Sequence, residues 1–148
     1  QIMPSVDVSF GYTFMDSEQK SIGKTAYGAP NAGTGMEFPG TPKHSASLWA
    51  TYKPTQKLTL GLGAYAQSSM VASYAYASST NPNTLLIRQV SGYARYDAML
   101  SYVINPNVTF QLNVMNLGDK EYYASANSPH YATLGAGRSA VASLKFNY

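Results

Sequence analysis

The chain has 148 residues, of which only 11% are charged, and its formal net charge is +3. That charged share is less than half of the roughly 25% found in ordinary soluble domains, and scattered charges exclude the clustered cationic face of a nucleic-acid-binding protein. The sequence has no cysteine, which excludes a disulfide framework and thiolate chemistry. Thirteen tyrosines fit either a soluble all-β domain with aromatic turns or a membrane barrel with tyrosines at both interfaces.

Apolar and polar residues alternate along six segments. A period of two is the strand period, because successive side chains point to opposite faces of a pleated backbone. Strands are therefore predicted over residues 5–15, 42–53, 58–67, 89–103, 108–117 and 136–148. Long loops are predicted over residues 16–41, 68–88 and 118–135, and short turns over residues 53–57 and 105–107.

The even-numbered side of each predicted strand is apolar, and the charges deep within the strands have the opposite parity. These charges are Asp7, Arg95, Asp97 and Lys145. A lipid-facing Arg or Lys near the bilayer midplane would cost about 2–4 kcal/mol, so we expect hydrocarbon against the even side and water with a plug against the odd side. Arg88 and Arg138 have even parity, but they lie at strand ends and can snorkel. A soluble core would bury the apolar side instead, and alternation alone does not distinguish the two.

The predicted connections alternate between long and short along the chain. This order is typical of outer-membrane barrels, whose extracellular loops are long and whose periplasmic turns are short. No apolar run approaches the roughly 20 residues of a membrane helix, whereas strands of ten or more residues match the ~9–11 residues needed to cross a bilayer at a tilt. A soluble sandwich has no reason to place every long loop at one end.

Three segments resemble the TonB-dependent outer-membrane receptors. Residues 113–123 read Asn-Val-Met-Asn-Leu-Gly-Asp-Lys-Glu-Tyr-Tyr, similar to the N-V-x-N-L-x-D-K-x-Y-Y run near the carboxyl end of that family. Residues 39–49, ending in Thr-Pro-Lys-His-Ser-Ala-Ser-Leu-Trp, resemble the strand start of the siderophore-receptor branch, and residues 137–148 resemble the family's last strand. The motif residues are predicted to be structural, through strand-end hydrogen bonds and an interface aromatic pair. They are Pro42, Lys43, His44, Trp49, Asn113, Asn116, Leu117, Asp119, Tyr122, Tyr123, Phe146 and Tyr148.

The resemblance implies a barrel of about 22 antiparallel strands with a plugged lumen. Six strands cannot close such a barrel, so the chain is expected to be the carboxyl-terminal part of a longer receptor, without the plug domain and TonB box. The implied function is import of ferric siderophores, closest to the catecholate type, across the outer membrane of a Gram-negative bacterium. The implied partners are the ferric siderophore, outer-membrane lipid and the TonB–ExbB–ExbD complex. Iron would arrive within the ligand, so no cofactor, protein metal site, nucleic acid or enzymatic activity is expected.

Ferric siderophores are bulky and often anionic, and aromatic rings with arginine suit them through stacking and charge. The candidate ligand residues are Tyr74, Tyr76 and Arg88 in the second long loop, His130 and Tyr131 in the third, and Tyr65, Gln67 and Tyr93 near the lumen mouth. Each of these also fits a role in an aromatic girdle or in loop packing. Arg95 and Asp97 are expected to form a structural ion pair with the plug or a neighbouring strand, and Gly61 and Gly63 to make room inside the barrel.

Two other functions remain open at this point. A passive porin-like or structural barrel would conduct ions without TonB. A soluble β-sandwich binding module would remain in the aqueous phase without detergent.

Overall fold

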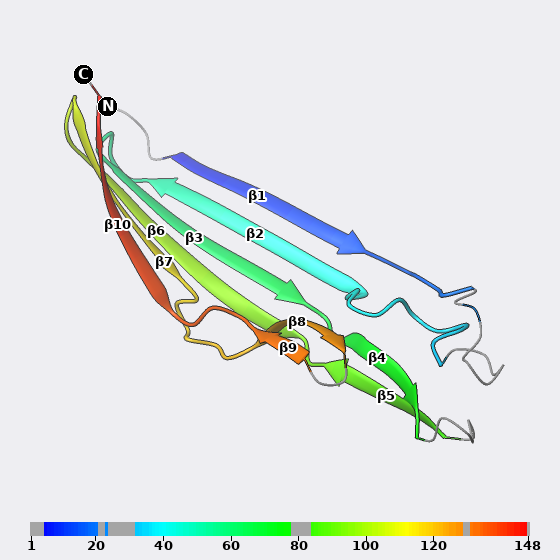
Figure 1. Ribbon diagram of the computed structural model, residues 1–148. Coiled ribbons are helices and arrows are strands. Elements are labelled where there is room, and N and C mark those ends of the chain that lie inside the picture. The colour runs from blue at the N-terminus through cyan, green and yellow to red at the C-terminus, as the bar shows by residue number, and fades with distance from the viewer. Residues whose placement is uncertain (1–4, 21–22, 24–31, 78–83, 129–130, 148) are drawn as a thin grey trace.

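A computed structural model describes residues 5–20, 23, 32–77, 84–128 and 131–147, which form three antiparallel sheets. The strands are β1 (Ser5–Phe14), β2 (His44–Lys53), β3 (Leu58–Gln67), β4 (Met70–Tyr76), β5 (Leu85–Val90), β6 (Tyr93–Asn105), β7 (Val108–Met115), β8 (Tyr123–Ser128), β9 (Tyr131–Leu134) and β10 (Ser139–Phe146). The main sheet has the order β1-β2-β3-β6-β7-β10 and is curved and open (Figure 1). Its six strands confirm the predicted all-β antiparallel class. In the described residues, no helix is long and apolar enough to span a membrane.

The long connections all leave the same end of the main sheet. At one end Ser5 pairs with Lys53 and Phe146 with Val108, and at the other Phe14 pairs with His44. The segments that join β1 to β2, β3 to β6 and β7 to β10 begin and end at this second end (Figure 1). We call it the loop end. The predicted alternation of long and short connections is therefore confirmed.

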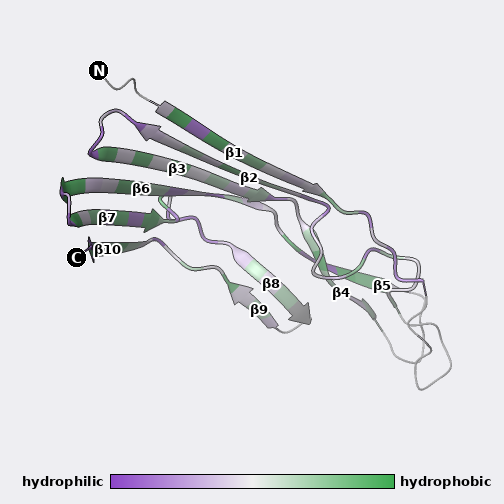
Figure 2. Ribbon diagram, turned by 90° about the horizontal axis from the view of Figure 1, so that it is seen from above, coloured by the Kyte–Doolittle hydropathy of each residue, from purple (hydrophilic) through white to green (hydrophobic). Residues whose placement is uncertain are grey.

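The strand register places the odd-numbered residues of the main sheet on one face, up to a bulge at the end of β6 where Asn105 pairs with Val108. Ser9 pairs with Trp49, Trp49 with Gly63 and Gly63 with Asp97, so a single odd-numbered row crosses four strands. The opposite, even-numbered face is apolar and open, with Leu62 57% exposed and Leu144 56% exposed. The alternating bands along β1, β6 and β7 in Figure 2 follow this pattern. The predicted division into an apolar even face and a polar odd face is confirmed.

The indole of Trp49 lies on the odd, concave face of the sheet across two glycines. A Cβ atom added to Gly63 would lie 2.3 Å from the ring, and one added to Gly61 would lie 2.8 Å from it. Contacts below 3.0 Å require something to move, so only glycine lets this ring lie flat against the neighbouring strand. The space predicted at Gly61 and Gly63 is therefore occupied by Trp49 of the same sheet.

Two of the predicted long loops contain hairpins. Residues 68–88 were expected to be loop but include β4 and most of β5, and residues 118–135 include β8 and β9. The predicted strand 89–103 is also divided, because its first two residues belong to β5 and β6 begins at Tyr93. Gly92 marks the break, since a Cβ there would lie 2.6 Å from the Gln67 carbonyl oxygen. The loop prediction failed because Met70, Val71 and Ala72 are buried in succession, which removes the period of two.

The two hairpins pack against each other at the loop end. Met70 and Ala72 of β4, Val90 of β5 and Ala126 of β8 form a buried apolar cluster, which we call the hairpin core. The backbone N–H of Gly40 also donates to the carbonyl of Val71, at 2.7 Å, and joins the first long connection to β4. Among the described residues, the buried apolar side chains thus lie in the hairpin region and not within the main sheet.

We expect Gly63→Ala to lower the free energy of unfolding by about 1–3 kcal/mol, the usual cost of overpacking, because the new methyl group would collide with the Trp49 ring. Gly118→Ala is the matched control, since a Cβ there meets nothing within 4 Å. Thermal unfolding followed by circular dichroism measures both. Equal stability of the two variants would contradict the role given to Trp49.

Candidate functional site

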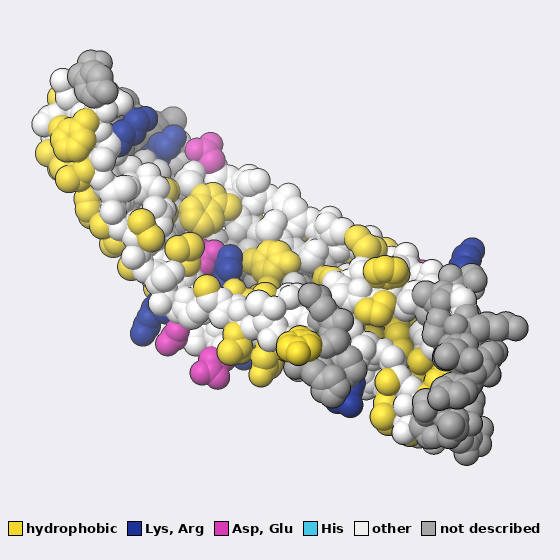
Figure 3. Space-filling view, in the orientation of Figure 1, with side chains coloured by type: hydrophobic (Ala, Val, Ile, Leu, Met, Phe, Trp, Pro, Cys, Tyr) yellow, Lys and Arg dark blue, Asp and Glu magenta, His cyan; other side chains and the backbone are white. Residues whose placement is uncertain are grey.

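Three tyrosine rings form a column on the concave face at the loop end; we call them the tyrosine cluster. Tyr65 of β3 and Tyr93 of β6 lie at odd positions, with their ring centroids 5.9 Å apart and their planes at 46°. Tyr122, just before β8, stacks on Tyr93 at 4.0 Å and 27°. The Tyr65 hydroxyl also donates to Gln67 Oε1 at 3.1 Å. Figure 3 looks onto this face, where backbone and uncharged polar side chains cover most of the sheet.

Arg95 lies directly beside the tyrosine cluster. Its Nη1 donates to the Tyr122 hydroxyl at 3.2 Å, and its Nη2 pairs with Asp97 Oδ2 at 3.1 Å. The other Asp97 carboxylate oxygen accepts from the backbone N–H of Asn116 at 2.8 Å. The expected ion pair is thus present, but Arg95 and Asp97 pair with each other along one strand. The Arg95 side chain is 32% exposed, so it can meet an anion on the concave face.

Asn116 organises the turn that follows β7. It is 1% exposed and is the one buried polar side chain among the described residues. Its Nδ2 donates to the carbonyls of Lys120, at 2.9 Å, and Ala136, at 3.0 Å, while its Oδ1 accepts from the Lys120 N–H at 2.8 Å. Its φ of 52° lies in the left-handed region, which asparagine tolerates better than most residues. We call these contacts the Asn116 clamp.

Asp119 extends the same turn toward β10. Its φ is 50°, and its N–H donates to the carbonyl of Asn116 at 2.8 Å. Its Oδ1 accepts from the backbone N–H of Arg138 at 2.8 Å. These contacts are compatible with the strand-end hydrogen bonding expected of Asn116 and Asp119.

Tyr122 and Tyr123 diverge instead of forming the expected aromatic pair. Tyr122 is 8% exposed and Tyr123 is 49% exposed, because neighbouring residues of an extended chain point to opposite sides. The Tyr122 ring lies against Gly135, where an added Cβ would be 2.1 Å from it, and the Gly135 N–H donates to the Tyr122 carbonyl at 2.7 Å. The expectation of an interface pair is therefore wrong for Tyr122, which turns onto the concave face.

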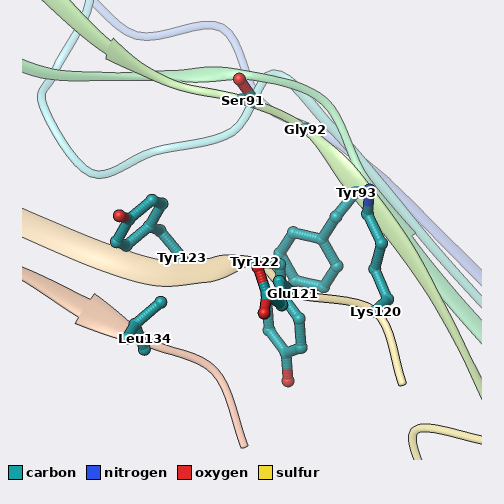
Figure 4. Close-up of a pocket in the computed structure, with 8 residues that line it drawn as sticks. All are labelled: Ser91, Gly92, Tyr93, Lys120, Glu121, Tyr122, Tyr123 and Leu134. Atoms are coloured by element: carbon teal, nitrogen blue, oxygen red, sulfur yellow. The ribbon is translucent and has the colours of Figure 1, made fainter. Parts of the chain in front are cut away.

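A cavity of about 280 Å³ opens next to the tyrosine cluster. Figure 4 shows Tyr93 and Tyr122 on one side of it and Tyr123 with Leu134 on the other. Its lining residues are Ser91, Gly92, Tyr93, Lys120, Glu121, Tyr122, Tyr123 and Leu134. The aromatic faces suit a planar group, while the charges of Lys120 and Glu121 in the lining offset each other and the half-buried Arg95 beside Tyr122 adds a positive charge. Within the described part of the chain, no three His, Cys, Asp or Glu side chains are placed to hold a metal ion.

The structure separates the predicted ligand residues into two groups. Tyr65, Gln67 and Tyr93 come together on the concave face. The others lie on the hairpins: Tyr74 and Tyr76 are half-buried on β4, Arg88 is exposed on β5, and Tyr131 is 77% exposed on β9. His130 lies outside the described residues.

Tyr74 packs against the first long connection. A Cβ added to Gly33 would lie 3.0 Å from its ring. Burial raises the pKa of the Tyr74 hydroxyl, and the nearby Glu37 carboxylate adds to that rise. The Tyr74 ring is thus held by packing against the first long connection.

The motif residues Pro42 and Lys43 precede β2, His44 begins it at the loop end, and Trp49 lies on its concave face. The Tyr12 hydroxyl and His44 Nδ1 are hydrogen-bonded at 2.8 Å, and Phe14 lies 5.2 Å from the His44 ring. Lys43 follows Pro42, and its Nζ pairs with Glu37 Oε1 at 3.1 Å, a hydrogen bond that raises the pKa of the lysine. These contacts are compatible with the strand-end roles expected of Lys43 and His44.

The remaining motif residues occupy β7, its turn and β10. Asn113 Oδ1 accepts from Gln111 Nε2 at 3.1 Å, and the Leu117 N–H donates to the Tyr96 carbonyl at 2.7 Å. Phe146 is 62% exposed at the end of β10. Tyr148 lies outside the described residues.

Sequence reasoning left Arg95 and Tyr122 out of the candidate ligand site. The parity of β6 could have indicated Arg95, because Tyr93, Arg95 and Asp97 follow one another on the odd face. No periodic signal could have placed Tyr122 there, since its position depends on the turn formed by Asn116 and Asp119.

An exposed apolar face, a polar concave face and long connections at one end define the wall of an outer-membrane β-barrel. The chain belongs to the family described as "TonB dependent receptor-like, beta-barrel", whose model matches residues 4–117. This family is found in the outer membrane of Gram-negative bacteria, so the even face of the main sheet is the lipid-facing side.

Individual relatives match almost the whole chain. A probable TonB-dependent siderophore receptor, PiuA from Acinetobacter baumannii, is 39% identical over 152 residues, covering 100% of this chain and 19% of its own length. The catecholate siderophore receptor Fiu from Escherichia coli K12 is 36% identical over 130 residues, covering 88% of this chain and 16% of its own length. The crystal structure of PiuA superimposes with a TM-score of 0.78 at 39% identity, over 97% of this chain and 20% of that one. The chain therefore spans about a fifth of the relatives that it matches.

We expect Gly135→Ala to destabilise the fold by about 1–3 kcal/mol, because its methyl group would displace the Tyr122 ring. Gly137→Ala is the control two residues further on, where the added Cβ makes only an ordinary contact of 3.6 Å with Asp119. Thermal unfolding of each variant in detergent measures the difference. A Gly135→Ala protein as stable as the Gly137→Ala protein would contradict the described packing.

Proposed function

We propose that this chain forms part of the wall of an outer-membrane receptor that imports ferric siderophores with energy supplied through TonB. The observation that supports the proposal is the tyrosine cluster beside the half-buried Arg95 side chain on the concave face. It occurs in a chain that is 39% identical along its whole length to a protein described as a siderophore receptor. A passive pore needs no such stacking surface.

We further propose a catecholate-type ligand. Catecholates are planar, electron-rich rings with anionic oxygens around the metal, so tyrosine faces can stack on them and a guanidinium can neutralise their charge. The likeness to Fiu, which is described as a catecholate siderophore receptor, supports this choice. Iron would enter as cargo within the ligand, and the protein would supply no metal ligands of its own.

The ligand would first meet the hairpins and then the concave face. Tyr76, Arg88 and Tyr131 on the hairpins would make the first contact, together with Tyr74 and His130 as predicted from the sequence. Tyr65, Gln67 and Tyr93 lie further in, beside Arg95. This order follows from the position of the hairpins beyond the loop end of the main sheet (Figure 1).

The open edges of the main sheet support a longer barrel. Strands β1 and β10 are its two edges, and in lipid each unpaired backbone group costs several kcal/mol. We therefore propose that the chain supplies six carboxyl-terminal strands of a larger barrel. The plug domain and the segment that contacts TonB–ExbB–ExbD would belong to the amino-terminal part of that receptor.

We expect Tyr93→Leu to weaken binding of a ferric catecholate about threefold to tenfold, the loss of one aromatic contact. Tyr96→Leu is the matched control, because Tyr96 lies on the same strand but on the lipid-facing side, where it is 52% exposed. Equilibrium binding to the purified full-length receptor measures both. Equal weakening by the two substitutions would place the ligand elsewhere.

We expect iron uptake by a strain that carries this receptor to stop when TonB is removed. Growth under iron limitation on a panel of single ferric siderophores, with and without TonB, measures this and identifies the ligand. A passive barrel would support the same growth in both strains, because diffusion through a pore needs no energy coupling. That result would contradict the proposed function.

A further inference from the structure

We propose that Asn116 is a positioning residue for ligand capture, which sets affinity by holding Tyr122 against Tyr93 and Arg95 without touching the ligand. The proposal rests on the function proposed above and deepens it. At 1% exposure the Asn116 side chain cannot reach a ligand. Its effect must therefore pass through the residues that it holds.

The contacts around Asn116 form a closed circuit. Its backbone N–H donates to Asp97 Oδ1, Asp97 Oδ2 accepts from Arg95 Nη2, and Arg95 Nη1 donates to the Tyr122 hydroxyl. The Asn116 side-chain amide closes the circuit, because it binds both the N–H and the carbonyl of Lys120, two residues before Tyr122. Asp97, Arg95 and Tyr122 are thus linked to Asn116 both through hydrogen bonds and through the backbone of residues 116–122. Loss of the Asn116 side-chain amide would remove its hydrogen bonds to Lys120.

Asparagine meets two demands at position 116 that other residues do not meet together. Its φ of 52° favours asparagine or glycine, and the paired bonds to Lys120 require a side-chain donor and acceptor on one short stem. Glycine would keep the φ but lose the amide. Alanine would lose both, and aspartate would lose the donor to the Lys120 and Ala136 carbonyls.

Tyr122 connects the Asn116 clamp to Tyr93 and Arg95, the groups proposed to face the ligand. Its ring is 8% exposed, stacks on Tyr93 at 4.0 Å, and its hydroxyl accepts from Arg95. Arg95 Nε makes no hydrogen bond within the described part of the chain, so Tyr122 and Asp97 alone orient the guanidinium there. If residues 116–122 were no longer held, Tyr122 would no longer fix the orientation of the Tyr93 ring and the Arg95 guanidinium. The site would then lose its preorganisation for the ligand.

The test uses the full-length receptor with 3-fluorotyrosine at position 122, and the iron(III) complex of 2,3-dihydroxybenzoate as the probe. The variants are Asn116→Ala and Asn116→Gly, the latter for the case in which alanine fails to fold. Asn113→Ala is the matched control, because the hydrogen bond described for that amide is with Gln111 and lies outside the circuit. Fluorine NMR reports the environment of ring 122 without any ligand, and equilibrium binding reports affinity.

We expect both Asn116 variants to shift the fluorine resonance and to weaken probe binding about tenfold, which corresponds to 1.4 kcal/mol, while Asn113→Ala does neither. In a double-mutant cycle, Asn116→Gly should weaken binding no further once Tyr122→Leu is present. An unshifted resonance, or effects of the two substitutions that multiply, would overturn the proposal. A wild-type receptor that binds no probe would count against the catecholate function alone, because the fluorine signal still decides whether Asn116 holds Tyr122.

Discussion

Hydrocarbon offers no hydrogen bond to a peptide group, and this constraint governs the main sheet. Every strand that crosses lipid must satisfy its backbone through its neighbours, so the six strands pair in unbroken order from β1 to β10, with a bulge between Val103 and Asn105. The same lipid requires one apolar face, and a slip of one residue would exchange the two faces. Both the pairing of the strands and the alternation of apolar and polar side chains therefore follow from contact with lipid. They leave the concave face free to carry Trp49, Arg95 and the tyrosine cluster.

The sequence predicted those parts of the fold that lipid contact controls. Six alternating segments became the six strands of the main sheet, and Asp7 and Lys145 kept the parity expected of them. The hairpins escaped prediction because both sides of β4 are covered, as the consecutive burial of Met70, Val71 and Ala72 shows. Outside the bilayer no one-sided pattern is required, so alternation stops being informative.

The candidate site was predictable only where it lies on regular strands. Tyr65 and Tyr93 follow from parity and from their position near the strand ends. Tyr122 depends on two residues with positive φ and on an amide that binds backbone twenty residues away, at Ala136. Such a contact is set by tertiary structure, because the chain must return through Gly135 and Ala136 before the Asn116 amide can bind the Ala136 carbonyl. The sequence motif indicates that Asn116, Asp119 and Tyr122 have a structural role, but it does not predict the orientation of the Tyr122 ring.

The hairpin core has a consequence for how receptors of this family could exchange their outer surfaces. Met70, Ala72, Val90 and Ala126 come from two hairpins that are far apart in the sequence, so each hairpin buries its apolar side chains against the other. A chimera that grafts one of them onto a related barrel would split this buried cluster and expose both halves to water. Recombination that preserves this buried cluster would have to transplant both hairpins together.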